Sequence, residues 1–337
     1  MTFEEFKKKY EKVEVKEYPN TVPSNPLVSV HIQTYQHKNF IKTCLDSILA
    51  QKTDFPFEIL IGEDDSSDGT REICIEYAKR HPDKIRLFLH SRENNIPKLN
   101  KPSEFFNITY NRFSAHGKYL SSCDGDDYWI DPLKLQKQAE LLENDPSCMA
   151  VCTNFKICDT DNNIISEARY NYPDGSNYKF AFKNLLNYRV TTRTLMVMWR
   201  NCPAAIEQYS EFNETPLGDK VIILLMSQYG DIKYINDITA VFRKGSGFYT
   251  PNRKKQSFYR EAISWFHLYR YYQGTCFQNI IRIQLHDTLV KRMNELSLVT
   301  LVRDYFSDKK IRFSLFWLIA LKVFNKNEIP VDWYQFT

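Results

Sequence analysis

Hydrophobic and polar residues follow two alternating patterns between residues 27 and 142. Short apolar and β-branched runs predict four strands, at 27–33, 57–63, 84–90 and 118–123. Between these runs the apolar residues recur at helical spacing, which predicts four helices, at 39–51, 70–80, 104–115 and 132–142. Strands that alternate with helices in this way are typical of a parallel sheet covered on both faces. We therefore predict an α/β fold with a mostly parallel central sheet flanked by helices.

The pattern differs on both sides of this block. Residues 1–26 combine a polar helical pattern with a linker interrupted by prolines. Later strand-like runs and one helix are predicted at 148–158, 193–199, 217–229 (the helix), 232–237 and 239–244, with a polar loop at 159–177. The pattern is mostly helical from about residue 254. We predict three parts: an N-terminal helix and linker (1–26), a main α/β domain (27–250) and a helical C-terminal extension (251–337).

Composition narrows the function classes. The formal net charge of the 337-residue chain is only +4, which requires no nucleic-acid-binding surface, so we expect no nucleic-acid partner. The first residues are too acidic for a signal peptide, and no run of about 18 apolar residues could span a bilayer. We interpret Cys148, Cys152 and Cys158 as buried reduced thiols, with a zinc site as the lesser alternative. These features favour a cytoplasmic protein.

The strongest candidate for chemistry is the acidic run at 124–127, which follows the fourth predicted strand. Its carboxylates, on Asp124, Asp126 and Asp127, repel one another unless a cation lies between them. Oxygen ligands suit Mg²⁺ or Mn²⁺, and both cations also bind substrate phosphates. The alternative is a solvated acidic turn before the next helix. The position directly after an apolar strand favours the metal site.

A second acidic run occupies residues 63–70 and follows the second predicted strand. In parallel sheets ligands bind beyond the carboxyl ends of the strands, where both acidic runs fall. We expect Asp64 to face a ligand. Asp68 and Thr70 are better explained as the cap of the following helix.

Three segments together resemble family 2 glycosyltransferases: Gln33-Thr34-Tyr35, E-D-D-S-S-D-G-T at 63–70, and G-K-Y-L-S-S-C-D-G-D-D-Y-W at 117–129. The resemblance covers residues 27–250, and the run 117–138 is similar to bacterial members that build surface polysaccharides. It implies the type A nucleotide-sugar transferase fold. It also implies inverting transfer from a nucleotide-diphosphate sugar, with a UDP-sugar expected, to a saccharide or lipid-linked saccharide acceptor. The implied cofactor is Mn²⁺ or Mg²⁺.

The resemblance assigns expected roles to individual residues in these three motifs. The donor-binding residues that it implies are Thr34, Tyr35, Asp64 and Asp124, and the implied metal ligands are Asp126 and Asp127. Within this set, Asp64 would contact the base, since Glu63 replaces the first carboxylate of the usual pair. Asp124 would contact the ribose, and Asp126 would bind the metal on the diphosphate.

Two later segments extend the resemblance. The segment 217–220 resembles the one that supplies the general base, which implies Asp219, although a helix N-cap explains the same residue. Glu211 and Glu214 are the next candidates for that base.

The segment 241–244 resembles the one beside the donor phosphates, but Gly245 stands where a histidine is usual. We therefore expect Arg243 or Lys244 to supply the positive charge opposite the phosphates. His37 and His116 lie in loop or helix-end positions, which ordinary surface histidines explain equally well.

Three other functions compete with a transferase. A nucleotidyltransferase would favour a phosphate loop rich in glycine and basic residues after the first strand, and a dehydrogenase would need G-x-G-x-x-G there; the chain has Gln33-Thr34-Tyr35-Gln36-His37 instead. A non-catalytic nucleotide-sugar or saccharide-binding module would not need the intact carboxylates.

The C-terminal segment 309–326 contains a very apolar stretch with basic flanks. A helix of this kind lies either in a membrane interface or against protein. We favour packing against protein slightly, and peripheral contact with the inner face of a membrane is the alternative.

Overall fold

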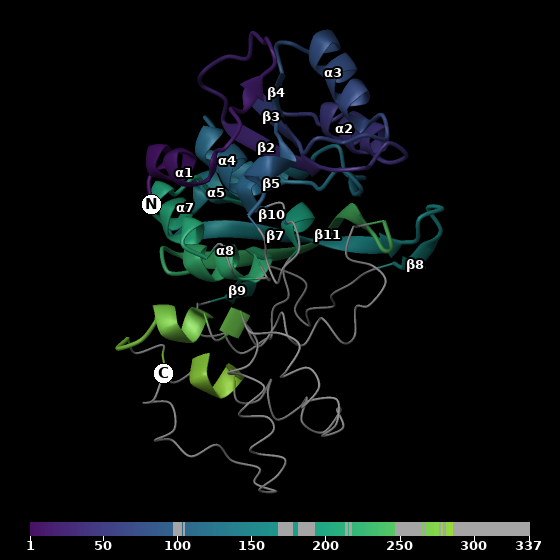
Figure 1. The fold of residues 1–337 in the computed structure, drawn as a ribbon. Helices are drawn as coiled ribbons and strands as arrows, with labels where there is room; N and C mark the ends of the chain where they lie inside the picture. The colour runs from purple at the N-terminus through teal and green to yellow at the C-terminus, as the bar shows by residue number, and fades with distance from the viewer. Residues whose placement is uncertain are drawn as a thin grey trace, which may run out of the picture. The chain divides into compact units, whose positions relative to one another are not determined.

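The computed structural model describes part of the chain, and Figure 1 draws that part as a coloured ribbon. The described residues are 1–96, 103, 105–167, 178–180, 193–212, 215, 218–246, 264–265, 267–275, 278 and 281–285, with the backbone alone at 178–180, 219 and 220. The chain divides into two compact units. The first comprises residues 1–213 and 222–250, and the second comprises 214–221 and 251–337.

The first unit is built on parallel strands, as the sequence predicted. The four strands are β2 (Val28–Thr34), β3 (Phe57–Glu63), β4 (Ile85–Leu89) and β5 (Tyr119–Ser122). Their spatial order is β4-β3-β2-β5, and each neighbouring pair is parallel. The short strand β1 (Lys16–Glu17) adds to β4 in the antiparallel sense. Part of the predicted linker therefore belongs to this sheet.

Helices cover both faces of this parallel half (Figure 1). On one face lie α2 (Ile41–Leu49) and α3 (Thr70–Arg80), and on the other lies α4 (Phe105–Ser114). The N-terminal helix α1 (Phe3–Tyr10) packs on α4, where the buried ring of Phe6 stacks on that of Phe106. The first predicted part thus contacts the main α/β unit, although its boundary at residue 26 stays a prediction.

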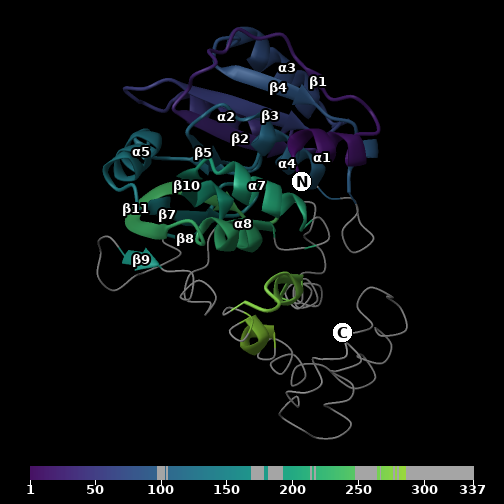
Figure 2. The ribbon, with the colours of Figure 1, turned by 90° about the vertical axis from the view of Figure 1, so that its left-hand side faces the viewer.

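The second half of the sheet is mixed. Beside β5 follow β10 (Val197–Arg200), β7 (Cys148–Cys158), β11 (Asp231–Arg243) and β6 (Tyr128–Trp129), with β8 (Ile164–Ser166) on β7 and β9 (Tyr178–Phe180) on β11. Of these, only β7 and β11 pair in the parallel sense. Figure 2 shows this half below the β2–β5 half. The fold class is confirmed as a mixed α/β sheet with flanking helices.

Three details differ from the sequence-based prediction. The two short strands predicted at 232–237 and 239–244 form one strand, β11, because register shifts on β7 accommodate the polar residues between them. Strand β8 lies in the predicted loop 159–177 and pairs with β7. The helix α5 (Lys134–Asn144) begins after Pro132, since a turn closed by the Lys134 N–H and the Asp131 carbonyl comes first.

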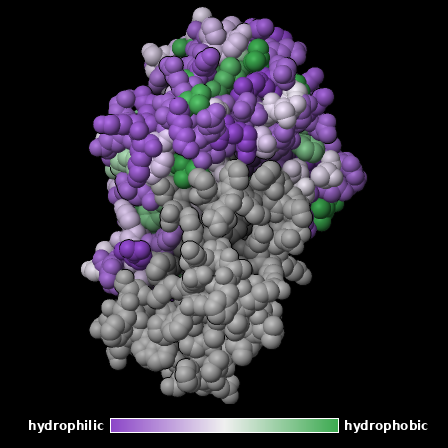
Figure 3. Space-filling model, in the orientation of Figure 1, coloured by the Kyte–Doolittle hydropathy of each residue, from purple (hydrophilic) through white to green (hydrophobic). Residues whose placement is uncertain are grey.

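The remaining elements connect these layers. They are the helical turns η1 (Arg92–Asn94) and η2 (Thr194–Met196) and the helices α7 (Pro203–Ser210) and α8 (Gly218–Met226). In the second unit, helical backbone is described at 267–271 and 281–285. Within the part of the chain that is described, no helix has the length and apolar character needed to cross a membrane. The visible described surface in Figure 3 is mainly hydrophilic, and the segment 309–326 lies outside the described residues.

Candidate active site

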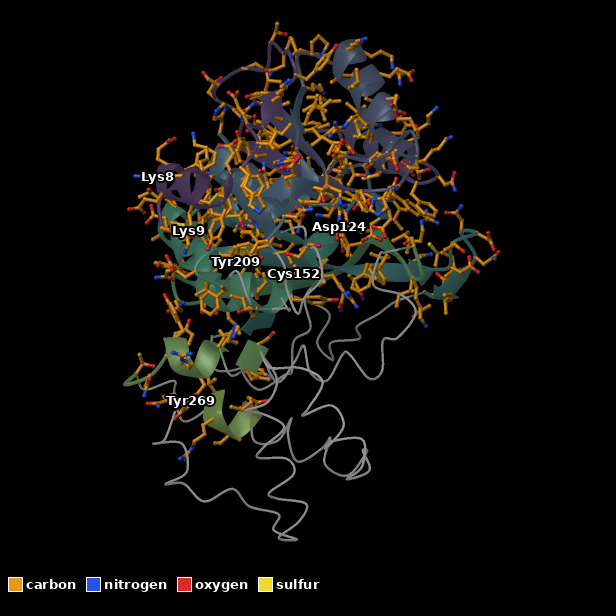
Figure 4. The ribbon with its side chains drawn as sticks, viewed as in Figure 1. Lys8, Lys9, Asp124, Cys152, Tyr209 and Tyr269 are labelled. Carbon is orange, nitrogen blue, oxygen red and sulfur yellow. The ribbon has the colours of Figure 1, made fainter. Side chains whose placement is uncertain are left out.

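Three of the sequence motifs meet at the carboxyl ends of β2, β3 and β5. The Asp64 N–H donates to the Thr34 carbonyl at 3.0 Å, which joins the first two motifs. The Gly125 N–H donates to the Gln33 carbonyl at 2.9 Å, which joins the first and third. Figure 4 labels Asp124, which lies where the two halves of the sheet meet. The topology thus brings the predicted donor-binding motifs to one edge, where ligands bind in such sheets.

Glu63, the last residue of β3, has a structural environment. Its carboxylate is fully buried and forms an ion pair with the Arg71 side chain. It also accepts from the backbone N–H groups of Asp65, at 3.3 Å, and Ser66, at 2.8 Å. Asp65 has a φ of 62°, which is uncommon for a residue with a side chain. Glu63 therefore holds the turn that presents its neighbour Asp64.

Asp64 is buried, and only one of its two oxygens has a hydrogen-bond partner among the described residues. Its Oδ2 accepts from Arg92 Nη1 at 2.7 Å and from Asn95 Nδ2 at 2.9 Å. Its Oδ1 is buried without a hydrogen-bond partner among the described residues. Burial raises the pKa of Asp64 to about 6, against the opposing effects of Asn95 and Arg92. A buried acceptor that no protein group uses is costly, so Oδ1 is available for a ligand.

Arg92 also stacks on Tyr35, with 3.8 Å between the guanidinium carbon and the ring centroid. Arg92 and Asn95 come from η1 and the residue after it, beyond β4. Neither residue was predicted from the sequence to be functional. The signal available was their place just beyond a parallel strand, next to the strand that carries Asp64.

The second acidic cluster is held differently. Asp127 is buried, and its Oδ1 accepts from the Arg243 backbone N–H at 2.7 Å. Burial raises the pKa of Asp127 well above its ordinary value, and the charges of Asp126 and Asp124 raise it further. The half-buried Asp126 accepts from Ser246 Oγ at 2.6 Å. The mutual repulsion of these carboxylates is what a bound divalent cation would relieve, so the residues present fit Mn²⁺ or Mg²⁺.

The protein alone supplies only part of such a cation's coordination shell. In the described part of the chain, no group of three His, Cys, Asp or Glu side chains is arranged to hold a metal ion. Mg²⁺ commonly takes one or two carboxylates together with substrate phosphates and water. The cluster therefore fits a cation that arrives with, or is completed by, a phosphorylated ligand.

Arg243 and Lys244 lie in contrasting environments. Arg243 is 3% exposed, and its Nε donates to the Asp126 carbonyl at 2.9 Å. Its Nη1 donates to Asn162 Oδ1 at 2.8 Å, so it links the second acidic cluster to the turn between β7 and β8. Lys244 is exposed. Of these two predicted counter-charges, Arg243 is engaged in holding the site, and Lys244 is open to an approaching anion.

The remaining predicted carboxylates lie outside the two acidic clusters or serve as helix caps. Asp68 Oδ1 accepts from the Thr70 N–H at 3.0 Å, in keeping with a structural role at the start of α3. Asp219 is the second residue of α8 and belongs to the second unit, and its side chain lies outside what is described. Glu211 forms an ion pair with the N-terminus at 3.2 Å, and Glu214 lies outside the described residues. The general base stays a prediction.

Comparison with known proteins identifies related sequences. Residues 29–100 match the family described as glycosyl transferase family 2. An uncharacterized protein of Mycobacterium tuberculosis is 31% identical over 228 residues, which cover 66% of this chain and 61% of that protein. A chondroitin synthase of Escherichia coli is 29% identical over 234 residues, which cover 69% of this chain and 30% of the synthase. The chain thus spans less than two thirds of the length of these relatives.

Among solved structures, the chain is similar to residues 1–349 of S. aureus TarS, determined in complex with UDP-GlcNAc. The TM-score is 0.52 at 16% sequence identity, and the match covers 92% of each chain. At this level of identity the likeness concerns the fold, which is the type A transferase fold predicted from the motifs.

Proposed function

Because the chain belongs to glycosyltransferase family 2, we propose that it transfers a sugar from a uridine diphosphate sugar to a saccharide or lipid-linked saccharide acceptor. The observation that carries the choice of donor is the unpartnered Oδ1 of Asp64. Its position at the end of β3, close to Thr34 and Tyr35, is where a nucleobase is expected in this family. The UDP-GlcNAc bound by the structural neighbour supports the same choice.

Hydrogen-bond complementarity favours uracil. The N3–H of uracil is a single donor, and Asp64 Oδ1 is a single free acceptor, because Arg92 and Asn95 occupy Oδ2. Cytosine has an acceptor at N3, so it could donate to Oδ1 only through its exocyclic amino group. Guanine presents two adjacent donors, which a carboxylate pairs best with both oxygens free. Arg92, stacked on Tyr35, fixes one wall of this pocket.

The diphosphate end is proposed to lie at the second acidic cluster. Asp126 and Asp127 would hold Mn²⁺ or Mg²⁺, which when bound stabilises the charge of the departing nucleoside diphosphate, and Asp124 would contact the ribose. Arg243 keeps Asp126 and Asp127 in place through its two contacts with them. The exposed Lys244 is free to face the phosphates.

The transfer step needs a base on the acceptor side. We assign it to Asp219, which would take the proton of an acceptor hydroxyl as that oxygen attacks the anomeric carbon. Attack from the face opposite the leaving diphosphate inverts the anomeric configuration. The chondroitin synthase relative and the motif run at 117–138 support a polymeric saccharide acceptor of a bacterial surface polysaccharide.

Hydrolysis of nucleotide sugars tests this function, because a transferase without acceptor still releases nucleoside diphosphate slowly to water. We expect Mn²⁺-dependent release of UDP from one or more UDP-sugars, and no release from GDP-sugars. Thermal shift with UDP and Mn²⁺ should show stabilisation, since a ligand that binds only the folded state raises its stability. Release from GDP-sugars alone would refute the uridine assignment, and no binding of any nucleotide would favour a non-catalytic saccharide-binding module.

A further inference from the structure

One histidine that the sequence left without a role lies next to the second acidic cluster. His37, in the loop between β2 and α2, is half-buried, and its Nδ1 is 3.2 Å from Thr34 Oγ1. A Cβ atom added to Gly125 would lie 2.9 Å from this nitrogen and 2.6 Å from Thr34 Oγ1. Glycine at position 125 therefore allows the imidazole to lie directly against the turn that carries Asp126.

The electrostatics support the same proximity. Burial lowers the pKa of His37, and among the charges that oppose this effect Asp126 is the largest and Asp68 the second. The imidazole is thus close to the carboxylate assigned to the metal. The segment that resembles the phosphate side of the family has Gly245 in place of its usual histidine, so no imidazole comes from there.

The backbone around His37 is held by hydrogen bonds to the loop that follows β3. The His37 N–H donates to Thr70 Oγ1 at 2.9 Å, and the next N–H, of Lys38, donates to Asp68 Oδ2 at 3.0 Å. Gln36, with a φ of 56°, accepts through its Oε1 from the N–H groups of residues 67 and 68. A non-glycine residue in this region is uncommon and is kept only where the surroundings fix it.

The hydrogen bond between the Thr34 hydroxyl and His37 Nδ1 is compatible with either tautomer of the imidazole. When the hydroxyl donates to Nδ1, the proton of the neutral imidazole lies on Nε2. In that tautomer His37 presents an N–H donor close to Asp126.

We propose that His37 donates this hydrogen bond to a diphosphate oxygen of the bound donor. The inference rests on the proposed function, in which the base lies at Asp64 and the metal at Asp126. The diphosphate must pass between these two points. Thr34 connects the two points: its carbonyl accepts from the Asp64 N–H, and its hydroxyl is hydrogen-bonded to His37. His37 would thus be a donor contact that the family's phosphate-side motif does not provide.

Calorimetric titration with uridine and with UDP tests the proposal, because only UDP contains the diphosphate. For His37→Leu we expect uridine affinity within about twofold of wild type and UDP affinity lower by roughly tenfold or more, with and without Mn²⁺, the scale of one hydrogen bond to a charged group. His37→Gln retains an N–H donor of similar reach and should recover part of the loss. His81→Leu, at the end of α3, is the matched control and should bind both ligands as wild type does.

Each other outcome overturns the proposal in a distinct way. Equal losses for uridine and UDP would make His37 a residue that only shapes the loop. A loss confined to titrations with Mn²⁺ would make it a metal ligand instead of a diphosphate contact. Unchanged UDP affinity would remove it from the site. If wild type binds neither uridine nor UDP, the proposed function itself fails, which this experiment separates from a failure of His37 alone.

Discussion

The two acidic clusters of this chain end parallel strands of one sheet, yet their side chains are partnered differently. At the end of β3, Glu63 pairs with Arg71, and Asp64 with Arg92 and Asn95. At the end of β5, the buried Asp127 receives one backbone N–H, and its carboxylate neighbours oppose its ionisation. The carboxylates of the first cluster are paired with the protein's own cations and donors, although burial still raises the pKa of Asp64 to about 6. In the second cluster, the Arg243 N–H and the charge of Arg193 offset only part of the burial and repulsion at Asp127.

This difference indicates two kinds of binding. A cluster whose carboxylates are already paired presents one acceptor without a partner among the described residues, Asp64 Oδ1, and that suits recognition of one base. A cluster whose charges repel one another gains most from a divalent cation. In free-energy terms, we expect the first cluster to be arranged before a ligand binds and the second to be stabilised by a cation.

The largest expected effect comes from the second cluster. Asp126→Asn removes a charge of the proposed metal site, so Mn²⁺-dependent UDP binding should be lost and transfer should fall by roughly 10³-fold. Uridine affinity should stay near wild type, because the base binds at the other cluster. Calorimetry with uridine, UDP and Mn²⁺, together with a transfer assay, measures both.

Two results would contradict this division of roles. The first is wild-type turnover that is unaffected by EDTA, which would remove the metal from the mechanism. The second is a parallel loss of uridine affinity in Asp126→Asn, which would mean that the clusters are one coupled site. Asp237→Asn, on the exposed part of β11, is a matched control because it removes a carboxylate remote from both clusters in sequence.

A carboxylate outside both clusters should affect transfer alone. Asp219→Asn keeps the capacity to cap a helix and removes the charge, so the fold should persist. Donor and metal affinity should stay near wild type, while transfer to acceptor falls by roughly 10²-fold, the usual scale for a lost general base. If the Asp219→Asn variant transfers sugar at the wild-type rate, Asp219 is not the general base. Glu211→Gln and Glu214→Gln would then be tested in the same assay.

Sequence patterns predicted where both acidic clusters lie, but not which residues pair with the carboxylates of the first. Thr34, Asp64 and Asp124 follow apolar runs, and a strand end is recognisable from local periodicity. Arg92 and Asn95 reach Asp64 only because β4 pairs with β3, a contact between distant segments that no spacing encodes. Tertiary pairing therefore decided which basic residue belongs to the site.

The second half of the fold was predicted less completely for the same reason. Strand β8 has three residues in a polar segment and exists because β7 supplies its partner. Arg243 stands in a motif that predicts a phosphate contact, yet burial between Tyr128 and Phe40 gives its side chain a structural environment. Burial of a charged side chain depends on packing from several elements, which periodicity does not reveal.

The smallest expected effect separates the clusters by pH. Burial raises the pKa of Asp64 to about 6, so its carboxylate loses its charge in a range where an ordinary aspartate stays ionised. Because Arg92 and Asn95 donate to Oδ2, the proton goes to Oδ1 and opposes the N3–H of uracil with a second donor. Uridine affinity should fall about tenfold from about pH 7.5 to about pH 5.

The pKa of Asp64 is higher in the folded state than in the unfolded state, so protonation of Asp64 favours folding as the pH falls. The loss of uridine affinity therefore cannot come from unfolding driven by this group. Uridine carries no phosphate that titrates in this range, and Asp64→Asn, which should bind weakly at every pH, is the control. Calorimetry across the range decides the matter: a flat profile in wild type would mean that Asp64 does not contact the base.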